Sequence, residues 1–117
     1  MSAEPRRIAS RAASRSSSTI ATSPRPRFAL APNAPNPFNP ITTIRFELAQ
    51  TGPASLRVYS AQGRLVRTLV NGRLAAGAYR VRWDGKDDAG HGAATGVYFY
   101  ELKEGARSLT RRMSLLK

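Results

Sequence analysis

Hydrophobic and polar residues alternate along most of the chain after residue 40, with the period of two that a β-strand with one buried face requires. The clearest case is residues 42–48, where Ile44, Phe46 and Leu48 alternate with polar or charged positions. In the last strand, expected at residues 107–116, the side chains of Leu109, Met113 and Leu115 are expected to point inward. Because no segment after residue 40 shows the spacing of an amphipathic helix, the pattern predicts an all-β protein. The other strands are expected at residues 54–60, 64–70, 77–84 and 96–102.

Residues 77–102 are expected to build much of the core, because they hold the only Trp of the chain and most of its Tyr residues. Aromatic side chains bury more area than any others. Residues 96–102 include four consecutive apolar or aromatic side chains, which indicates a strand covered at least partly on both faces. The loop between the two strands, residues 85–95, is rich in Gly and Asp and favours sharp turns.

Turn signals separate the strands and fix the fold class. Gly63 is expected at positive φ in a tight turn, Asn71-Gly72 is a strong hairpin signal, and Glu104-Gly105 marks the next reversal. With the Pro-rich lead-in, these segments predict an immunoglobulin-like antiparallel β-sandwich of about seven strands. The side chains expected at its centre are those of Ile44, Phe46, Leu56, Val58, Leu69, Tyr79, Val81, Trp83, Tyr98 and Tyr100.

The chain divides at residue 28. Residues 1–27 contain six Arg, one acidic residue and many Ser, a composition that cannot offset the entropy of folding, so a disordered basic tail or linker is predicted. This tail lacks the apolar stretch of a secretory signal peptide. Residues 28–117 form the predicted sandwich. Their first part, residues 28–40, carries four Pro, which favours an extended segment, and Phe38 is expected to anchor it on the core.

The net charge of +12, from 19 basic and 7 acidic residues, suggests a nucleic acid or an anionic surface as one class of partner. A basic tail on an Arg-rich protein explains the same number. Arg80 and Arg82 share one strand face, and Arg111 and Arg112 lie on the last strand, where exposed basic residues also protect sheet edges. The chain has no Cys, and no apolar run reaches the roughly 20 residues that a membrane helix needs.

No catalytic constellation is found in the sequence. Asp84, Asp87 and Asp88 cluster in one loop, but their spacing does not match a calcium-binding EF-hand loop, and a solvated turn explains them. His91 is the only His and has no partner residue in view. Without a nucleophile motif or a phosphate-binding loop, the sequence predicts no enzyme activity, no cofactor and no metal.

A set of short motifs, in order and at consistent spacing, resembles the C-terminal Ig-like modules of secreted bacterial proteins. These are the sorting domains of type IX secretion and the related Ig-like domain of the flagellar hook-capping protein FlgD. The resemblance covers residues 33–117. The motifs read NPFNP, V-Y-S-A-Q-G, A-G-A-Y, W-D-G-K-D and G-V-Y-F-Y, and the positions that carry them are Asn36, Pro37, Phe38, Asn39, Pro40, Gly63, Gly77, Tyr79, Trp83, Asp84, Gly85, Gly90, Gly96 and Tyr98.

The resemblance implies a non-catalytic module that directs the export or surface attachment of a larger bacterial protein. The expected partner is the secretion machinery, a cargo domain is expected upstream, and the expected location is outside the cell or on its surface, reached through the periplasm. Recognition is expected at the end of the chain, through Arg111, Arg112, Met113, Leu115 and Lys117. An assembly module of the hook-cap type, using a sheet face or edge, is the alternative, and a small basic protein that binds nucleic acid or an anionic surface is a second alternative.

Overall fold

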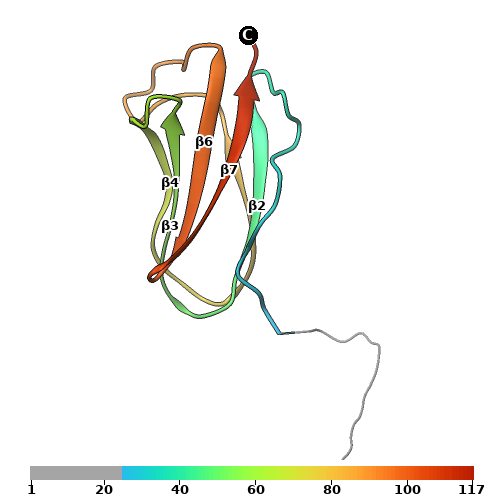
Figure 1. The fold of residues 1–117 in the computed structure, drawn as a ribbon, viewed down its shortest axis with the longest axis vertical. Coiled ribbons are helices and arrows are strands. Elements are labelled where there is room, and N and C mark those ends of the chain that lie inside the picture. The colour runs from blue at the N-terminus through green and yellow to red at the C-terminus, as the bar shows by residue number, and fades with distance from the viewer. Residues whose placement is uncertain (1–24) are drawn as a thin grey trace, which may run out of the picture.

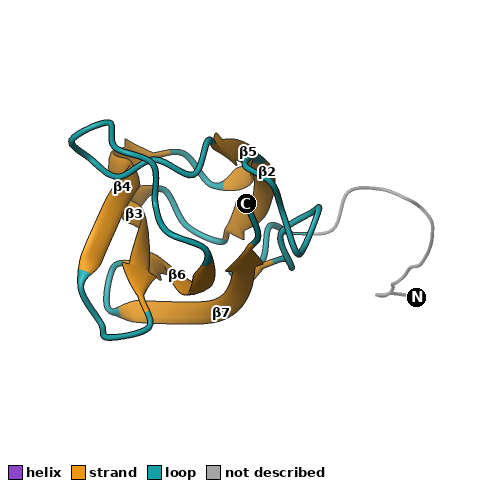
Figure 2. Cartoon of the chain, turned by 90° about the horizontal axis from the view of Figure 1, so that it is seen from above, coloured by secondary structure: helices purple, strands orange, loops and turns teal. Residues whose placement is uncertain are grey.

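The structure, a computed structural model, describes residues 25–117, so the first 24 residues of the tail predicted to be disordered, residues 1–27, lie outside the described residues. The described residues form seven β-strands and no helix, as the sequence pattern predicts. Two sheets pack face to face (Figures 1 and 2). The strands are β1 (Ala29–Leu30), β2 (Thr42–Leu48), β3 (Gly52–Ser60), β4 (Leu65–Leu74), β5 (Gly77–Trp83), β6 (Gly96–Glu104) and β7 (Arg107–Leu115).

One sheet has three strands in the order β1-β2-β5, and the other has four in the order β4-β3-β6-β7. All neighbouring strands are antiparallel. The chain passes from one sheet to the other after β2, after β4 and after β5, and the last of these crossings is the long Gly- and Asp-rich loop. This arrangement confirms the predicted immunoglobulin-like sandwich.

The core lies between the two sheets and contains most of the side chains that the sequence placed there. Leu69, Tyr79 and Val81 are only partly buried. They lie on β4 and β5, which are edge strands of their sheets, so each is covered from one side only. The buried core is formed by Leu30, Phe38, Ile44, Phe46, Leu48, Ala54, Leu56, Val58, Trp83, Ala93, Tyr98, Tyr100, Leu102, Met113 and Leu115.

The turn predicted at Asn71-Gly72 is wrong. Both residues lie inside β4, which continues to Leu74 because β3 begins early enough, at Gly52, to pair with it. The chain reverses after Leu74 instead and enters β5 at Gly77, which has a φ of 142°. The free energy of the additional strand pairing outweighs the local turn preference of the Asn-Gly pair.

The four apolar residues at the start of β6 have two different environments. Tyr98 and Tyr100 point into the core and are buried. Val97 is 39% exposed, and Phe99 is half-buried on the outer face of the four-stranded sheet. The expectation that this strand is covered on both faces is therefore wrong for the outer face, which no other described element covers.

Candidate functional site

The motif NPFNP attaches the Pro-rich segment to the outer edge of β7. The backbone N–H of Phe38 donates to Ser114 O, and the N–H of Leu116 donates to Phe38 O, both at 3.0 Å. The side-chain oxygen of Asn36 accepts from the N–H of Ser114 at 3.0 Å. The Phe38 ring is buried, 5.5 Å from the Trp83 ring, so the segment is anchored as predicted. It thereby covers backbone groups of β7 that would otherwise form an open sheet edge.

The remaining residues of NPFNP lie on the surface of this segment. Pro37, Asn39 and Pro40 are exposed. The carbonyl oxygen of Pro40 approaches Gly85 so closely that a Cβ there would lie 2.9 Å from it. Gly85 also has a φ of 76°, a backbone conformation that residues with a side chain rarely adopt. The motifs NPFNP and W-D-G-K-D are therefore in direct contact, and only Gly fits at the point of contact.

The motif W-D-G-K-D folds the long loop by capping its own backbone. The indole N–H of Trp83 donates to Lys86 O at 2.8 Å. Asp84 Oδ1 accepts from the N–H of Lys86 at 3.1 Å. Asp87 Oδ1 accepts from two further backbone N–H groups, those of Ala89 at 3.0 Å and His91 at 2.9 Å. The carboxylates of this loop therefore serve as turn caps. Within residues 25–117, no group of His, Cys, Asp or Glu side chains is placed to hold a metal ion.

The same loop is fastened to the edge of β4. Asp88 N donates to Val66 O at 2.9 Å, and Asp88 Oδ1 accepts from the N–H of Thr68 at 3.1 Å. Arg67 donates to two carbonyl oxygens of the loop at 3.3 Å, and its guanidinium lies 3.8 Å from the carboxylates of Asp84 and Asp88. Sequence reasoning did not identify Arg67, because its partners are 20 residues away along the chain.

Two tyrosines make the same local contact at the start of β5 and β6. The hydroxyls of Tyr79 and Tyr98 each donate to the carbonyl oxygen of an Ala four residues earlier, both at 2.6 Å. In each case a Gly lies two positions before the Tyr, with a φ of 142° at Gly77 and 157° at Gly96. Burial raises the pKa of Tyr98, and its hydrogen bond opposes that effect. The repeated pattern A-x-G-x-Y in the sequence is the signal for this contact.

The other two glycines of the motifs occupy tight turns. Gly63 has a φ of 85°, as predicted, and its N–H donates to Ser60 O at 2.9 Å to close the turn between β3 and β4. Gly90 has a φ of 87° and donates to Asp87 O at 3.0 Å within the long loop. Both positions favour Gly for conformational reasons.

The residues expected to carry recognition at the end of the chain are divided between two environments. Met113 and Leu115 are 1% and 0% exposed, so both point into the core as the alternation of the last strand predicts. The period of β7 turns both side chains inward. Arg112 and Lys117 are exposed. Arg111 is also exposed, but its Nε donates to Leu30 O and links β7 to β1 across the two sheets. Arg112 and Lys117 are therefore the free cationic groups of this set.

Tyr100 is a central residue whose hydrogen bonds sequence reasoning did not foresee. Its hydroxyl accepts from the N–H of Asn33 and donates to Ala31 O, both at 2.9 Å. Burial raises the pKa of Tyr100, while the contact with Asn33 and the charge of Arg111 oppose this. The contact fixes the first part of the Pro-rich segment to the middle of the four-stranded sheet.

Glu104 fastens the end of the sandwich at which β2 turns into β3. Its carboxylate accepts from the backbone N–H groups of Ala49 at 2.6 Å and Gln50 at 3.1 Å, in the turn that joins β2 to β3. The other oxygen pairs with Arg107. Burial alone would raise the pKa of Glu104, but the Arg107 hydrogen bond and the two backbone donors outweigh it and lower the pKa. Glu104 therefore acts as an ionised cap, whereas the other carboxylates of the described residues are half-buried or exposed.

The sandwich, its capped loop and its anchored Pro-rich segment define a compact Ig-like module. Residues 38–108, more than half of the chain, match the family model of the FlgD Ig-like domain, so the chain belongs to the FlgD Ig-like domain family. A comparison with curated protein sequences gives no match. No helix in the described part of the chain is long and apolar enough to cross a membrane.

Solved structures of several larger bacterial proteins contain a part with the same fold. PorZ from Porphyromonas gingivalis matches with a TM-score of 0.51 and 20% identity over 75% of this chain and 11% of PorZ. Dimeric latent PorU from the same organism matches with a TM-score of 0.58 and 17% identity over 88% of this chain and 10% of PorU. FlgD from Xanthomonas campestris gives a TM-score of 0.50 and 21% identity over 64% of this chain and 55% of FlgD. These identities show a shared fold, and the chain spans only about a tenth of PorZ and PorU.

Proposed function

We propose that this protein is a non-catalytic Ig-like module that directs the export or surface attachment of a larger bacterial protein through type IX secretion. The observation that carries the proposal is the likeness to PorZ across 75% of the chain. PorZ is described as an essential bacterial surface component of the type IX secretion system, and PorU from the same organism matches 88% of this chain. In both proteins the matching part is about a tenth of the whole, which supports a module attached to a larger cargo. The location would be outside the cell or at its envelope.

The exposed cations at the end of β7 are the proposed recognition groups. Arg112 is exposed on the outer face of β7. Lys117 is held by its backbone N–H, which donates to Thr95 Oγ1 at 3.0 Å. Met113 and Leu115 would contribute by holding the strand in place from inside the core. Two exposed cations near the end of the chain favour recognition by a protein of the secretion machinery with acidic residues.

A reporter fusion tests the proposal. The full chain is placed behind an export signal and a reporter in a host with type IX secretion, and the reporter is measured in the periplasm, on the surface and in the medium. Removing residues 111–117 would also remove Met113 and Leu115 from the core, so substitutions are the sharper test. R112Q together with K117Q should leave the reporter in the periplasm, whereas R73Q with K86Q, which removes the same charge elsewhere, should not. A wild-type fusion that stays in the periplasm would refute the proposal.

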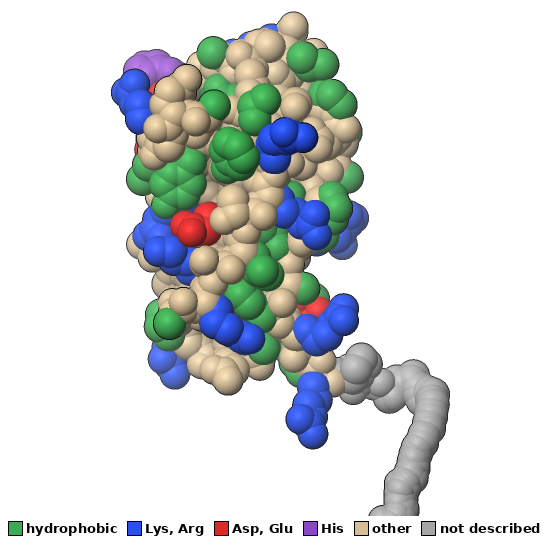
Figure 3. All heavy atoms as spheres, in the orientation of Figure 1, with side chains coloured by type: hydrophobic (Ala, Val, Ile, Leu, Met, Phe, Trp, Pro, Cys, Tyr) green, Lys and Arg blue, Asp and Glu red, His purple; other side chains and the backbone are tan. Residues whose placement is uncertain are grey.

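An assembly module of the hook-cap type is the second candidate, because part of one sheet face is apolar. On the outer face of the four-stranded sheet, Leu65 is 50% exposed and Val97 39%, beside half-buried Tyr59 and Phe99. The register places Tyr59 directly opposite both Leu65 and Phe99. Figure 3 shows hydrophobic side chains gathered over the upper part of this face. Exposed apolar patches on a protein surface often mark sites of contact with another protein.

The two candidates predict opposite results in the same fusion experiment. If the module sorts cargo by its terminal cations, F99S should leave export unchanged and R112Q with K117Q should abolish it. If the module is an assembly module that acts through the apolar sheet face, the wild-type fusion should itself stay in the periplasm, and F99S should instead weaken binding of the domain to its assembly partner. Far-ultraviolet circular dichroism and a melting curve of each variant show whether the domain is still folded.

The proposed unit of function begins at Phe28. The guanidinium of Arg107 lies 4.7 Å from the centre of the Phe28 ring, and Leu30 is buried. Residues 1–27 would then serve as a linker ahead of the module.

A further inference from the structure

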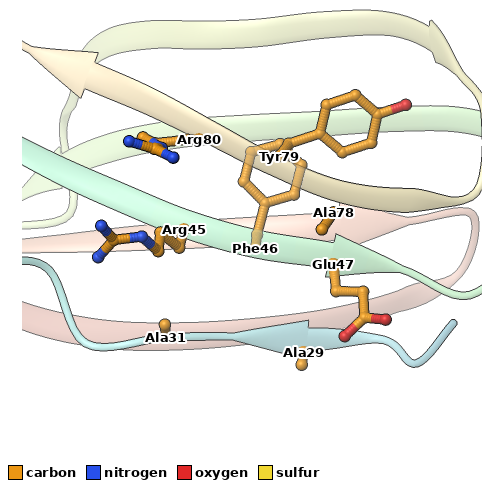
Figure 4. A pocket seen from close by; sticks show the side chains of 8 residues that line it. All are labelled: Ala29, Ala31, Arg45, Phe46, Glu47, Ala78, Tyr79 and Arg80. Carbon is orange, nitrogen blue, oxygen red and sulfur yellow. The ribbon is translucent and has the colours of Figure 1, made fainter. Parts of the chain in front are cut away.

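The outer face of the three-stranded sheet contains a shallow hollow of about 360 Å³. Its side chains come from three adjacent strands, because Ala29 is opposite Glu47, Glu47 is opposite Ala78, and Arg45 is opposite Arg80. The backbone N–H of Ala31 donates to Arg45 O at 2.9 Å, so Ala31 lies beside Arg45. Figure 4 shows the two guanidinium groups at one end of the hollow and the Glu47 carboxylate at the other.

Arg45 and Arg80 form a cross-strand pair of like charges. Such pairs destabilise a sheet when the residues are directly opposite each other. Among the ion pairs formed within residues 25–117, none involves either of these two arginines. Glu47, the acid nearest in the hollow, accepts a hydrogen bond from the backbone N–H of Arg27 instead. The positive charge at this point is therefore not compensated by the described residues, and Arg82 on the same strand face adds to it.

Edge protection does not explain the pair. Arginines on an edge strand discourage unwanted strand pairing, which accounts for Arg80 on β5. Arg45, however, lies on β2, the central strand of this sheet, where both backbone edges are already paired. A general need for solubility also does not explain why the residues around the two arginines have small side chains. Ala29, Ala31 and Ala78 keep the space beside the two guanidinium groups open.

We propose that this hollow is a binding site for a phosphate group, held between Arg45 and Arg80. A guanidinium presents planar N–H donors that match the oxygens of phosphate, and two of them facing one space supply both the charge and the hydrogen bonds. A bound phosphate would also remove the repulsion between the two arginines. The phosphate can belong to a lipid headgroup or to a small soluble molecule, and the chemistry at the site is the same.

The aromatic residues near the hollow indicate that it recognises the phosphate alone. Phe46 and Tyr79 contribute to its wall, but their rings stack on each other with centroids 5.3 Å apart on the core side of the sheet. Proteins that bind single-stranded nucleic acid use exposed aromatic rings on which bases stack. Since no such ring faces this hollow, a phosphate-bearing small molecule or lipid fits the site better than a nucleic acid strand.

Titration of the full chain with inorganic phosphate at low ionic strength tests the proposal. Backbone amide shifts in NMR spectra report the site and the dissociation constant. R45Q and R80Q should each weaken binding about tenfold, because a charge-assisted hydrogen bond contributes at least one decade in Kd. R73Q is the matched control, since it removes the same charge from an exposed position on the other sheet, and it should bind as the wild type does. Phosphate should raise the melting temperature of the wild type and of R73Q more than that of R45Q.

The outcomes are distinct. Equal weakening of phosphate binding in all three variants would show that binding depends only on net charge, and this would overturn the proposal. Absence of amide shifts at residues 29–31, 45–47 and 78–80 would show that phosphate binds elsewhere, and this would also overturn it.

Binding to phosphatidylglycerol vesicles but not phosphatidylcholine vesicles, lost in R45Q, would support the site and identify a lipid headgroup. Binding of free phosphate without vesicle binding would support the site and identify a soluble ligand. Tighter binding of single-stranded DNA than of phosphate, unaffected by R45Q, would contradict it.

Discussion

The hydroxyl of Tyr100 donates a hydrogen bond to the carbonyl oxygen of Ala31, 2.9 Å away, and so joins two residues separated by 69 positions in the chain. The same hydroxyl accepts from the N–H of Asn33. Both partners belong to the Pro-rich segment, and Tyr100 itself is fully buried in β6. One side chain therefore satisfies two backbone groups of a segment that has little regular secondary structure of its own.

Replacing Tyr100 by Phe should destabilise the domain by about 1–3 kcal/mol, because it leaves buried backbone groups of the Pro-rich segment without a partner. Urea unfolding followed by circular dichroism measures the change. Y59F is the matched control, since Tyr59 is only half-buried, on the outer sheet face, and it should unfold like the wild type. If Y100F were as stable as Y59F, the hydrogen bonds to the Pro-rich segment would not contribute to stability.

Replacing Trp83 by Ala should cost about 3–5 kcal/mol, the usual range for a large aromatic removed from a core. The Trp83 ring is fully buried and contacts the rings of Phe38 and Tyr98 at 5.5 and 5.7 Å. Thermal melting measures the loss. V97A, on the exposed face of β6, should change stability by less than about 0.5 kcal/mol. Near-wild-type melting of W83A would contradict the central place of this residue.

Replacing Gly85 by Ala should destabilise the domain by more than about 1 kcal/mol, because Ala at positive φ is strained. The added Cβ would also lie 2.9 Å from the carbonyl oxygen of Pro40, so the NPFNP segment would have to move. G72A is the control: nothing lies within 4 Å of a Cβ at Gly72, and the position is in a regular strand. Equal stability of the two variants would exclude close contact between the two motifs.

The stability of the domain should fall in acid as Glu104 is protonated. Its pKa is lowered in the folded state, so the unfolded chain binds the proton more readily over the range between the two pKa values. The contribution of Glu104 is therefore complete above the pKa of the unfolded state and is lost as the pH falls through that of the folded state. Urea unfolding at a series of pH values from 7 to 3 should show a smaller dependence for E104Q than for the wild type. An unchanged dependence would mean that other carboxylates dominate.

Removing residues 1–27 should leave the melting temperature unchanged, since the proposed domain begins at Phe28. Removing residues 1–33 should lower it, because this also removes buried Leu30 and the partners of Tyr100. Differential scanning calorimetry of both truncations locates the boundary. A large loss on removing only residues 1–27 would place part of the folded unit in the tail.

The positions of the strands could be predicted from the sequence because they depend on local chemistry. The alternation of Ile44, Phe46 and Leu48 gives β2 with its observed ends. Phe38 and Trp83 could be assigned to the core because large apolar side chains are rarely left in water. Gly63 could be assigned a positive φ because few other residues adopt it, and the structure shows 85°.

The candidate surfaces could be predicted only in part. The sequence indicates that Arg112 and Lys117 are available at the end of the chain, and both are exposed. The inward direction of Met113 and Leu115 also follows from the alternation of the last strand, but the sequence does not reveal that Arg111 links the two sheets. The pairing of Arg45 with Arg80 is equally absent from the local pattern, because the two residues lie on strands that are far apart in the chain.

The sequence by itself determined an all-β chain, the number and approximate limits of its strands, and the residues that must leave water, because each of these follows from the period and chemistry of neighbouring residues. The tertiary structure alone decided which strands share a sheet, that Asn71-Gly72 continues β4 rather than turning, and that Tyr100, Phe38 and Glu104 fasten distant segments. Those outcomes depend on pairing free energies between segments that meet only after folding, and such energies can exceed a local preference of about 1 kcal/mol.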